Sequence, residues 1–326
     1  MATYKEIRGT NIEVLESDPS NPVEGQVWYN STDNVLKGDA GTPVLVWTTT
    51  NPMNSGRYGL GSAGTQTSAL GFGGNGPSPG QTAVTESYNG TNWTEVNDLN
   101  EARHYVAGAG ASNTSALAFG GNGPPQTANT ESWNGSNWTE VNNLNEVKEL
   151  LGGSGTQTSA LAYGGARPGG YADLASTEIW NGTNWTEVNN LNTGRNGLSG
   201  AGADSTSAVA FGGVPSPSPA GLDITELWNG TNWTEVNDLN LARTYIGSAG
   251  IATAALAIGA QPSPQGQTES WNGTNWTEVN DLNVGRAGSL GGAGTNTLAL
   301  AFGGSGRSNA SEEWSLAGGT VTFTDS

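Results

Sequence analysis

The chain has no cysteine, a single histidine and few basic residues, and each shortage argues against a class of function. Without cysteine there is neither a disulfide nor a thiolate metal site. His104 alone cannot supply a histidine metal cluster, and no catalytic triad can be assembled around it. Eleven Lys and Arg against 29 Asp and Glu give a net charge of −18. Nucleic acid and anionic lipid reward clustered basic side chains, so we expect neither as a partner.

Long apolar runs are also missing. The first residues lack the apolar stretch of a signal peptide, and no segment is long enough to span a membrane. We therefore expect no membrane insertion. The same survey predicts no catalytic residue, no metal ligand and no cofactor. Glycine is abundant instead, and twelve Trp residues argue for a folded chain, because each is a large apolar side chain that folding buries.

A repeat organises most of the chain. The segment Glu-Ser-Trp-Asn-Gly-Ser-Asn-Trp-Thr-Glu-Val begins at Glu131, and similar segments recur before and after it. The second aromatic of each unit is Trp47, Trp93, Trp138, Trp185, Trp233 or Trp276. Successive spacings of 46, 45, 47, 48 and 43 residues are close to the length of one four-stranded propeller blade.

Further positions keep the same phase. A glycine pair such as Gly120-Gly121 ends an apolar run in five units, with Gly259-Ala260 as the variant. A basic residue recurs as Arg57, Arg103, Lys148, Arg195, Arg243 and Arg286. A glutamate that follows Thr, or Ser in the last unit, recurs as Glu86, Glu131, Glu178, Glu226, Glu269 and Glu312. Six occurrences of each slot predict six blades.

Each unit predicts four strands. Residues 103–110 are almost all small, as suits an innermost strand where blades converge. Residues 114–119 form a short apolar run that suits a strand buried on both faces. The third strand, residues 130–133, and the fourth, residues 138–141, are separated by an Asn-Gly turn. No segment has helical periodicity.

The repeat resembles the kelch repeat, in which an apolar strand and Gly-Gly precede two spaced aromatics and an Arg. The resemblance covers roughly residues 43–326 and implies an all-β fold, a six-bladed kelch-like β-propeller with a short N-terminal hairpin extension. Two features depart from the family pattern. The first aromatic is mostly Trp instead of Tyr, and the loop between the aromatics is shorter.

The two ends of the chain predict how the ring closes. Trp47 lies in a fourth-strand pattern that no first strand precedes, whereas the C-terminal part supplies the first three strands through Trp314. We expect the Trp47 strand to pair with the strand Glu312 to Trp314, because this removes an open edge. The alternating segment Thr320 to Thr324 is an alternative that could take the same place or add a fifth strand.

Residues 1–42 lie outside the repeat and form the predicted N-terminal attachment segment, followed by the propeller in residues 43–326. Residues 25–38 predict a hairpin around Ser31 to Asn34. This hairpin, followed by Asn-Gly-Thr-Asn-Trp-Thr units, resembles virion structural proteins of marine tailed bacteriophages, either tail-fibre or capsid-associated. The resemblance implies a non-enzymatic protein located in the virion. Residues 1–42 would bind other virion proteins, and the propeller would serve surface decoration or contact with a host-surface glycan or protein.

Each repeat slot has a structural and a functional interpretation. The Trp residues could be sugar-stacking platforms, but packing between blades is favoured because every unit has them. The base and the glutamate could form a ligand ring, but a repeated ion pair is favoured, with Lys148 the odd member because it lacks a planar fork. Asp98, Asp238 and Asp281 could suggest calcium, but Asn replaces Asp in other units, which favours solvated turn residues.

The loops between Gly-Gly and the Thr-Glu slot vary most in length and are rich in Pro, Gly and Ser. Repeat scaffolds commonly bind through the face where insertions vary. Their distinctive side chains, and our candidate partner-binding residues, are Arg167, Tyr171 and Arg307. An alternative function is a carbohydrate-binding, lectin-like propeller with sugar on Trp faces. A minor alternative is a glycoside hydrolase, since Asn-Gly-Thr-Asn-Trp is distantly similar to a sialidase Asp-box without its Asp.

Overall fold

The computed structural model describes residues 12–23, 25–39, 43–77, 80–124, 127–167, 169, 172–218, 220–262, 266–286, 288–318 and, for the backbone, 320–323. Every regular element within these ranges is a β-strand, and they contain no helix able to cross a membrane. The chain divides into two compact units, Met1–Val46 with Leu316–Ser326, and Trp47–Ser315. The all-β prediction is confirmed.

The first unit contains one four-stranded sheet, in which segments from both ends of the sequence pair. Its order is β1 (Glu13–Leu15), β2 (Val27–Asn30), β3 (Val35–Asp39) and β28 (Thr320–Phe323). β1 runs parallel to β2, and the other two pairs are antiparallel. The predicted hairpin is confirmed: β2 and β3 are joined at residues 31–34, where Asn34 adopts a φ of 58°.

Asp18 stabilises this sheet by accepting hydrogen bonds from three side chains. Its Oδ1 accepts hydrogen bonds from Asn30 Nδ2 at 2.8 Å and from the indole of Trp28 at 3.1 Å. Lys37 Nζ lies 2.9 Å from its other oxygen. The hydrogen bonds from Asn30, Lys37 and Trp28 lower the pKa of Asp18 to about 2, so the carboxylate stays charged at neutral pH.

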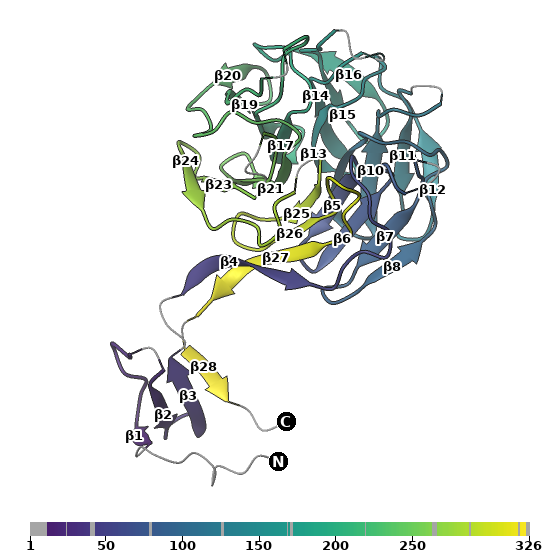
Figure 1. Cartoon of the computed structure of the whole chain (residues 1–326). Helices are drawn as coiled ribbons and strands as arrows, with labels where there is room; N and C mark the ends of the chain where they lie inside the picture. Colours follow the sequence, from purple (N-terminus) through teal and green to yellow (C-terminus); the bar gives the residue numbers. More distant parts are fainter. Residues whose placement is uncertain are drawn as a thin grey trace. The chain divides into compact units, whose positions relative to one another are not determined.

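The second unit consists of six repeat sheets of four strands each, and their arrangement is consistent with a β-propeller (Figure 1). Repeat sheet 1 contains β5 (Gly61–Thr65), β6 (Ser68–Phe72), β7 (Thr85–Tyr88) and β8 (Trp93–Val96). Repeat sheet 2 contains β9 (Ala107–Ser112), β10 (Ser115–Phe119), β11 (Thr130–Trp133) and β12 (Trp138–Val141). Repeat sheet 3 contains β13 (Gly152–Thr156), β14 (Ser159–Tyr163), β15 (Thr177–Trp180) and β16 (Trp185–Val188).

The remaining three repeat sheets follow the same order. Repeat sheet 4 contains β17 (Ser199–Asp204), β18 (Ser207–Phe211), β19 (Thr225–Trp228) and β20 (Trp233–Glu235). Repeat sheet 5 contains β21 (Gly247–Ile251), β22 (Ala254–Ile258), β23 (Thr268–Trp271) and β24 (Trp276–Val279). Repeat sheet 6 contains β25 (Gly291–Gly294), β26 (Ala299–Phe302), β27 (Ser311–Ala317) and β4 (Val44–Thr50). The described part of the chain therefore holds seven four-stranded sheets, six of them from the repeat.

The first strand of each unit is shorter than predicted. In the second repeat, β9 begins at Ala107 and not at Arg103. Arg103 lies in the linker that joins β8 of the first sheet to β9 of the second. The physical reason is the backbone of Tyr105, whose φ of 54° is left-handed and breaks the extended conformation between the base and the strand.

The sixth repeat sheet is completed from the N-terminal side, as predicted. β4 lies next to β27, and the ring of Trp47 lies 5.3 Å from that of Trp314. The alternative closing segment, Thr320 to Thr324, is not used here, because β28 pairs with β3 in the other unit. Alternation alone does not separate these two segments. A strand that ends this sheet also needs a large side chain in the Trp slot, and Trp47 is 4% exposed there.

The innermost strands approach so closely that glycine is required. A Cβ added to Gly108 in β9 would lie 2.4 Å from Ser62 O in β5, and one added to Gly292 in β25 would lie 2.2 Å from Ser248 O in β21. The backbone of one sheet thus occupies the space where the next would place a side chain. This explains the run of small residues in the first strand of every repeat.

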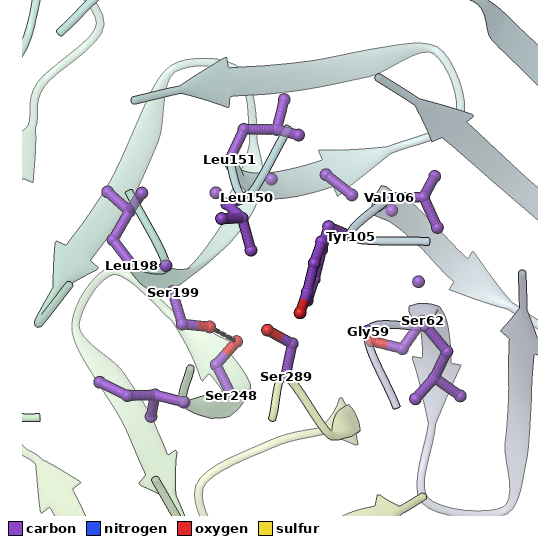
Figure 2. A pocket seen from close by; sticks show the side chains of 18 of the residues that line it. Gly59, Ser62, Tyr105, Val106, Leu150, Leu151, Leu198, Ser199, Ser248 and Ser289 are labelled. Carbon is purple, nitrogen blue, oxygen red and sulfur yellow. Dashed lines mark hydrogen bonds between the residues drawn. The ribbon is translucent and has the colours of Figure 1, made fainter. Parts of the chain in front are cut away.

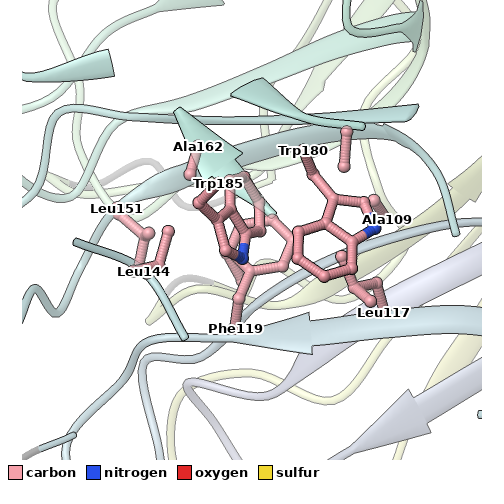
Figure 3. Packing of buried hydrophobic residues seen from close by; sticks show 10 residues of the cluster. Ala109, Leu117, Phe119, Leu144, Leu151, Ala162, Trp180 and Trp185 are labelled. Atoms are coloured by element: carbon pink, nitrogen blue, oxygen red, sulfur yellow. The ribbon is translucent and has the colours of Figure 1, made fainter. Parts of the chain in front are cut away.

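Aromatic side chains fill the space between neighbouring sheets farther out. Figure 3 shows the contact between sheets 2 and 3, where Phe119 at the end of β10 packs against Trp185 of β16. Their ring centroids are 4.9 Å apart, and Trp180 lies 5.4 Å from Trp185. The same pairing recurs between other sheets, as in Phe72 with Trp138. Both aromatic slots therefore belong to the core.

We predict that Trp47→Ala destabilises the repeat unit by about 3–5 kcal/mol, the usual cost of removing a buried Trp side chain. Urea denaturation followed by the remaining Trp fluorescence measures the change. Truncation after residue 318 is the control, because it removes β28 and leaves β4 in place. Equal loss of stability in both variants would show that the Trp47 strand has no special part in the sixth sheet.

We predict that Gly108→Ala lowers the stability of the repeat unit by about 1–3 kcal/mol, because overpacking forces the backbones of β9 and β5 apart. Gly76→Ala is the matched control, since a Cβ there meets no atom nearer than 3.8 Å. The denaturation midpoints of the two variants are compared. A midpoint for Gly108→Ala equal to that of Gly76→Ala would contradict the close approach of the inner strands.

Candidate functional site

The base and the glutamate of each repeat meet in a buried clamp. In the second repeat, Arg103 Nη2 donates to Glu131 Oε1 at 2.9 Å, and Nη1 donates to the carbonyls of Gly120 and Asn129. The other oxygen, Oε2, accepts from both the backbone and the side-chain amide of Asn100, at 2.8 and 2.7 Å. One carboxylate thus holds a whole linker against the third strand of the following sheet.

The clamp recurs in all six repeats, so the structure brings together the residues that the sequence pairs. The distances between base nitrogen and carboxylate oxygen run from 2.5 to 3.1 Å in Arg57–Glu86, Arg103–Glu131, Lys148–Glu178, Arg195–Glu226, Arg243–Glu269 and Arg286–Glu312. Lys148 differs, as expected for an ammonium group: it forms an ion pair with Glu178, and its hydrogen bond goes to the hydroxyl of Ser176 instead of to two carbonyls, as in Arg103.

The charged groups of the clamp are buried, so their desolvation costs free energy. Arg103 has no exposed surface, and burial lowers the pKa of its guanidinium while Glu131 opposes that change. Its Nε finds no acceptor among the described residues. Buried ion pairs define geometry more than they add net stability, and such incomplete hydrogen bonding fits that role. No spare charge remains at the clamp for a ligand.

The second Trp of each repeat is also committed to packing. Trp138 Nε1 donates to Thr85 Oγ1 of the preceding sheet at 3.1 Å, and Trp185 Nε1 donates to Thr130 Oγ1 at 3.0 Å. Trp47, Trp93, Trp233 and Trp276 make the equivalent bond. All six are between 4 and 6% exposed. Their faces are covered, so a sugar could not stack on them without opening the core.

The Asp and Asn residues considered for calcium are hydrogen-bond acceptors for the backbone. Asp98 Oδ1 accepts the N–H of Thr85 at 3.1 Å, and Asn143 Oδ1 accepts that of Thr130 at 3.1 Å. The bond needs one side-chain oxygen and no charge, which explains why Asp and Asn alternate in this slot. Within the described ranges, no three His, Asp or Glu side chains gather as a metal site would require.

The candidate partner-binding residues do not form one site. Arg167 is exposed and donates to Glu146 Oε1 from Nε at 3.0 Å and from Nη2 at 2.9 Å. Arg307 has a left-handed φ of 55° and donates to Asn75 Oδ1 at 3.3 Å. No contact joins the two arginines in the part of the chain that the structure describes. Tyr171 lies outside the described residues.

Sequence reasoning missed the residues that directly follow the base. These are Tyr58, His104, Glu149, Asn196 and Thr244 in the first five repeats. Each pairs with the residue after the Gly-Gly slot, as in His104 with Asn122 and Asn196 with Val214. The sequence contains a signal for this slot, because the residue type changes from repeat to repeat whereas the base before it is always Arg or Lys.

In four repeats the residue after this slot lines a small central pocket, which is about 90 Å³ in volume. These residues are Gly59, Tyr105, Leu150 and Gly197. Figure 2 shows Tyr105 beside Gly59 and Ser289, with Ser62, Ser199 and Ser248 around the pocket. Tyr105 and Tyr245 lie 6.3 Å apart between ring centroids, and Tyr105 N donates to Gly59 O. Burial raises the pKa of Tyr105, which keeps its hydroxyl protonated.

Glu149 is the one buried carboxylate without a basic partner in the described part of the chain. It is 6% exposed and accepts a hydrogen bond from the side-chain amide of Asn122. Burial raises its pKa, and the Asn122 bond opposes that rise. His104 contacts the backbone carbonyl of the same Asn122 at 3.2 Å, and burial lowers its pKa. These two side chains share a neighbour without contacting each other.

Known proteins do not place this chain in a family. Neither the family models nor the curated proteins searched give a match. Function must therefore be inferred from the site geometry.

A wider groove lies beside Tyr245, with a volume of about 680 Å³. It is formed by residues of the third, fourth and fifth repeats and includes the starts of three loops that the sequence analysis identified as variable. Its lining combines Leu150 and Val214 with the polar side chains of Asn196 and Gln261. Part of its lining is exposed or half-buried, as at Gln261 and Tyr245.

We predict that Glu226→Gln destabilises the repeat unit by about 3–5 kcal/mol, because the charge of Arg195 would stay buried without a counter-charge. Adding Arg195→Met to that variant should restore most of the loss. The exposed Arg167–Glu146 pair supplies the control, and Arg167→Ala should cost less than about 1 kcal/mol. Urea denaturation of the four proteins tests this. A Glu226→Gln variant as stable as the unaltered chain would contradict the clamp.

Proposed function

We propose that this chain is a non-enzymatic virion protein: a closed, six-bladed, kelch-like propeller that a phage particle presents for surface decoration or host contact. Residues 1–42 attach it to other virion proteins. The observation that carries the proposal is that recurring and variable side chains of the repeat have different places in the structure. The recurring side chains are engaged in the clamp and the aromatic contacts, and variable residues of the third, fourth and fifth repeats line the groove.

The closed ring is supported by contacts between the first and the sixth repeat sheets. Trp93 Nε1 donates to Ser311 Oγ at 3.0 Å, the same bond that Trp138 makes to Thr85 one sheet further on. Gly292 N lies 3.3 Å from Ser62 Oγ, between the innermost strands β25 and β5. In such a ring each repeat sheet keeps only short edge strands, such as β12 and β16, which suits a protein displayed at high local concentration.

The loop face supports a role in contact. Its segments connect the Gly-Gly slot to the third strand. Their described residues include buried ones, such as Leu174, and exposed ones, such as Arg167 and Gln261. Leu174 is buried and Val214 pairs with Asn196, so the ends of the loops are part of the fold. The net charge of −18 favours solubility and disfavours association with nucleic acid.

A second candidate function is carbohydrate binding, and the groove beside Tyr245 is the observation that favours it. The Trp faces do not support it, because they are buried. The minor alternative, a glycoside hydrolase, needs two carboxyl groups facing one cleft. The lining of the groove contains none.

Mass spectrometry of purified phage particles tests the location, and loop exchange tests the face. We predict that replacing residues 167–172 and 215–220 by Gly-Ser segments changes the melting temperature by less than about 4 °C, because buried Leu174 and the Val214 pairing remain. The same exchange should reduce attachment of particles to host cells. An equal exchange of exposed residues in the Asn229–Asn232 turn, on a different segment of sheet 4, is the control.

Absence of the chain from purified particles would refute the virion proposal. Unfolding on loop exchange, or equal attachment before and after it, would refute the assignment of the loop face. Hydrolysis of a glycan by the purified chain would refute the non-enzymatic role.

A further inference from the structure

The groove beside Tyr245 is lined in part by apolar groups. Leu150, Ala166 and Val214 line it together with the ring of Tyr245, which is half-buried. A volume of about 680 Å³ lies in the range of small-molecule sites in proteins. The groove therefore offers an apolar surface large enough for one or two rings.

The polar part of the groove's lining carries no charge. Its polar side chains are Asn196, Ser216, Ser218, Thr244 and Gln261, and every residue that lines it is uncharged. This neutrality is notable in a chain with a net charge of −18. A charged ligand would lose its hydration without gaining a counter-charge, so the lining favours a neutral one.

Two of these polar side chains are held in place by hydrogen bonds to the carboxylate of Asp173. Asp173 Oδ1 accepts hydrogen bonds from Asn196 Nδ2 at 2.6 Å and from Ser216 Oγ at 3.0 Å. Its Oδ2 accepts the backbone N–H of Ser216. Because the amide nitrogen of Asn196 is engaged, its Oδ1 is the group left to accept from a ligand hydroxyl. Such fixed polar groups lower the ordering cost of binding.

The backbone around the groove is already paired. Asn196 and Val214 exchange two hydrogen bonds, at 3.1 and 2.8 Å, and Thr244 and Gln261 do the same at 3.0 and 2.9 Å. An extended peptide that binds by strand addition needs free N–H and C=O groups at a sheet edge. The N–H and C=O groups of these four residues already pair with each other, so at these positions a ligand would be recognised by side chains.

We propose that this groove binds a neutral sugar residue, with the apolar face of the pyranose on Tyr245 and Leu150 and its hydroxyls on Asn196 and Gln261. Sugars combine one apolar face with hydroxyls around the ring, and the lining of the groove likewise combines apolar groups with uncharged polar side chains. The inference rests on the proposed contact function of the loop face and names the class of ligand that this face recognises.

Ligand-observed NMR by saturation transfer tests the proposal on the purified full chain. The neutral probes are methyl glucoside, methyl galactoside, methyl mannoside and N-acetylglucosamine, and the acidic probes are glucuronic acid and N-acetylneuraminic acid. We expect saturation of at least one neutral probe and of no acidic probe. Titration then gives its dissociation constant.

Two variants and a control locate the binding. Tyr245→Ala should weaken binding of the neutral probe at least about tenfold. Gln261→Ala should weaken it about threefold, and since Gln261 is exposed this variant keeps the test valid if the first does not fold. Tyr58→Ala is the control, because Tyr58 is a half-buried aromatic in the slot equivalent to Thr244 but does not line the groove. It should leave the constant unchanged within about twofold.

The proposal is overturned if no neutral probe binds, if acidic probes bind equally well, or if Gln261→Ala and Tyr245→Ala both bind as the unaltered chain does. Equal weakening by Tyr58→Ala would also overturn it. These outcomes are separate from the location of the protein. A chain found in particles that binds no sugar refutes this inference alone, and a sugar-binding chain absent from particles refutes the virion role alone.

Discussion

A carboxylate buried between a linker and a sheet is the interaction on which the repeat unit depends. Glu131 takes Arg103 on one oxygen and both N–H groups of Asn100 on the other. An unpaired buried carboxylate would be costly, so the linker has to enter each sheet along one path. Because that path is the same six times, the sheets succeed one another with a constant offset.

The constant offset explains the packing on either side of the clamp. It brings the aromatic at the end of the second strand, such as Phe119, onto the outer Trp of the next sheet, here Trp185. It also brings the inner backbones so close that Gly108 has no room for a Cβ beside Ser62. Glycine-rich inner strands and aromatic outer strands are thus two consequences of one geometry.

The clamp also determines where the repeats are free to differ. The residue after the base pairs with the residue after Gly-Gly, so the two variable stretches of a repeat meet at one end of its sheet. In the fourth and fifth repeats these pairs are Asn196 with Val214 and Thr244 with Gln261, and both line the groove. The residues at this end can therefore differ between repeats without disturbing the clamp. Glu149 occupies the same slot in the third repeat, where it is buried and has no basic partner among the described residues.

The sequence by itself determined the period, the four strands of each repeat, the hairpin at residues 31–34 and the strand of Trp47 beside that of Trp314. These follow from local patterns, because turn residues and alternation act over a few positions. Tertiary structure alone decided that Arg103 lies in a linker, that Asp98 caps the N–H of Thr85, and that Thr320–Phe323 pairs with β3. It alone also placed Asp173 behind Asn196 and Ser216. The reason is that a polar side chain in a variable loop follows no periodic pattern in the sequence. Its hydrogen-bond partner depends on which segments the packed sheets bring close together.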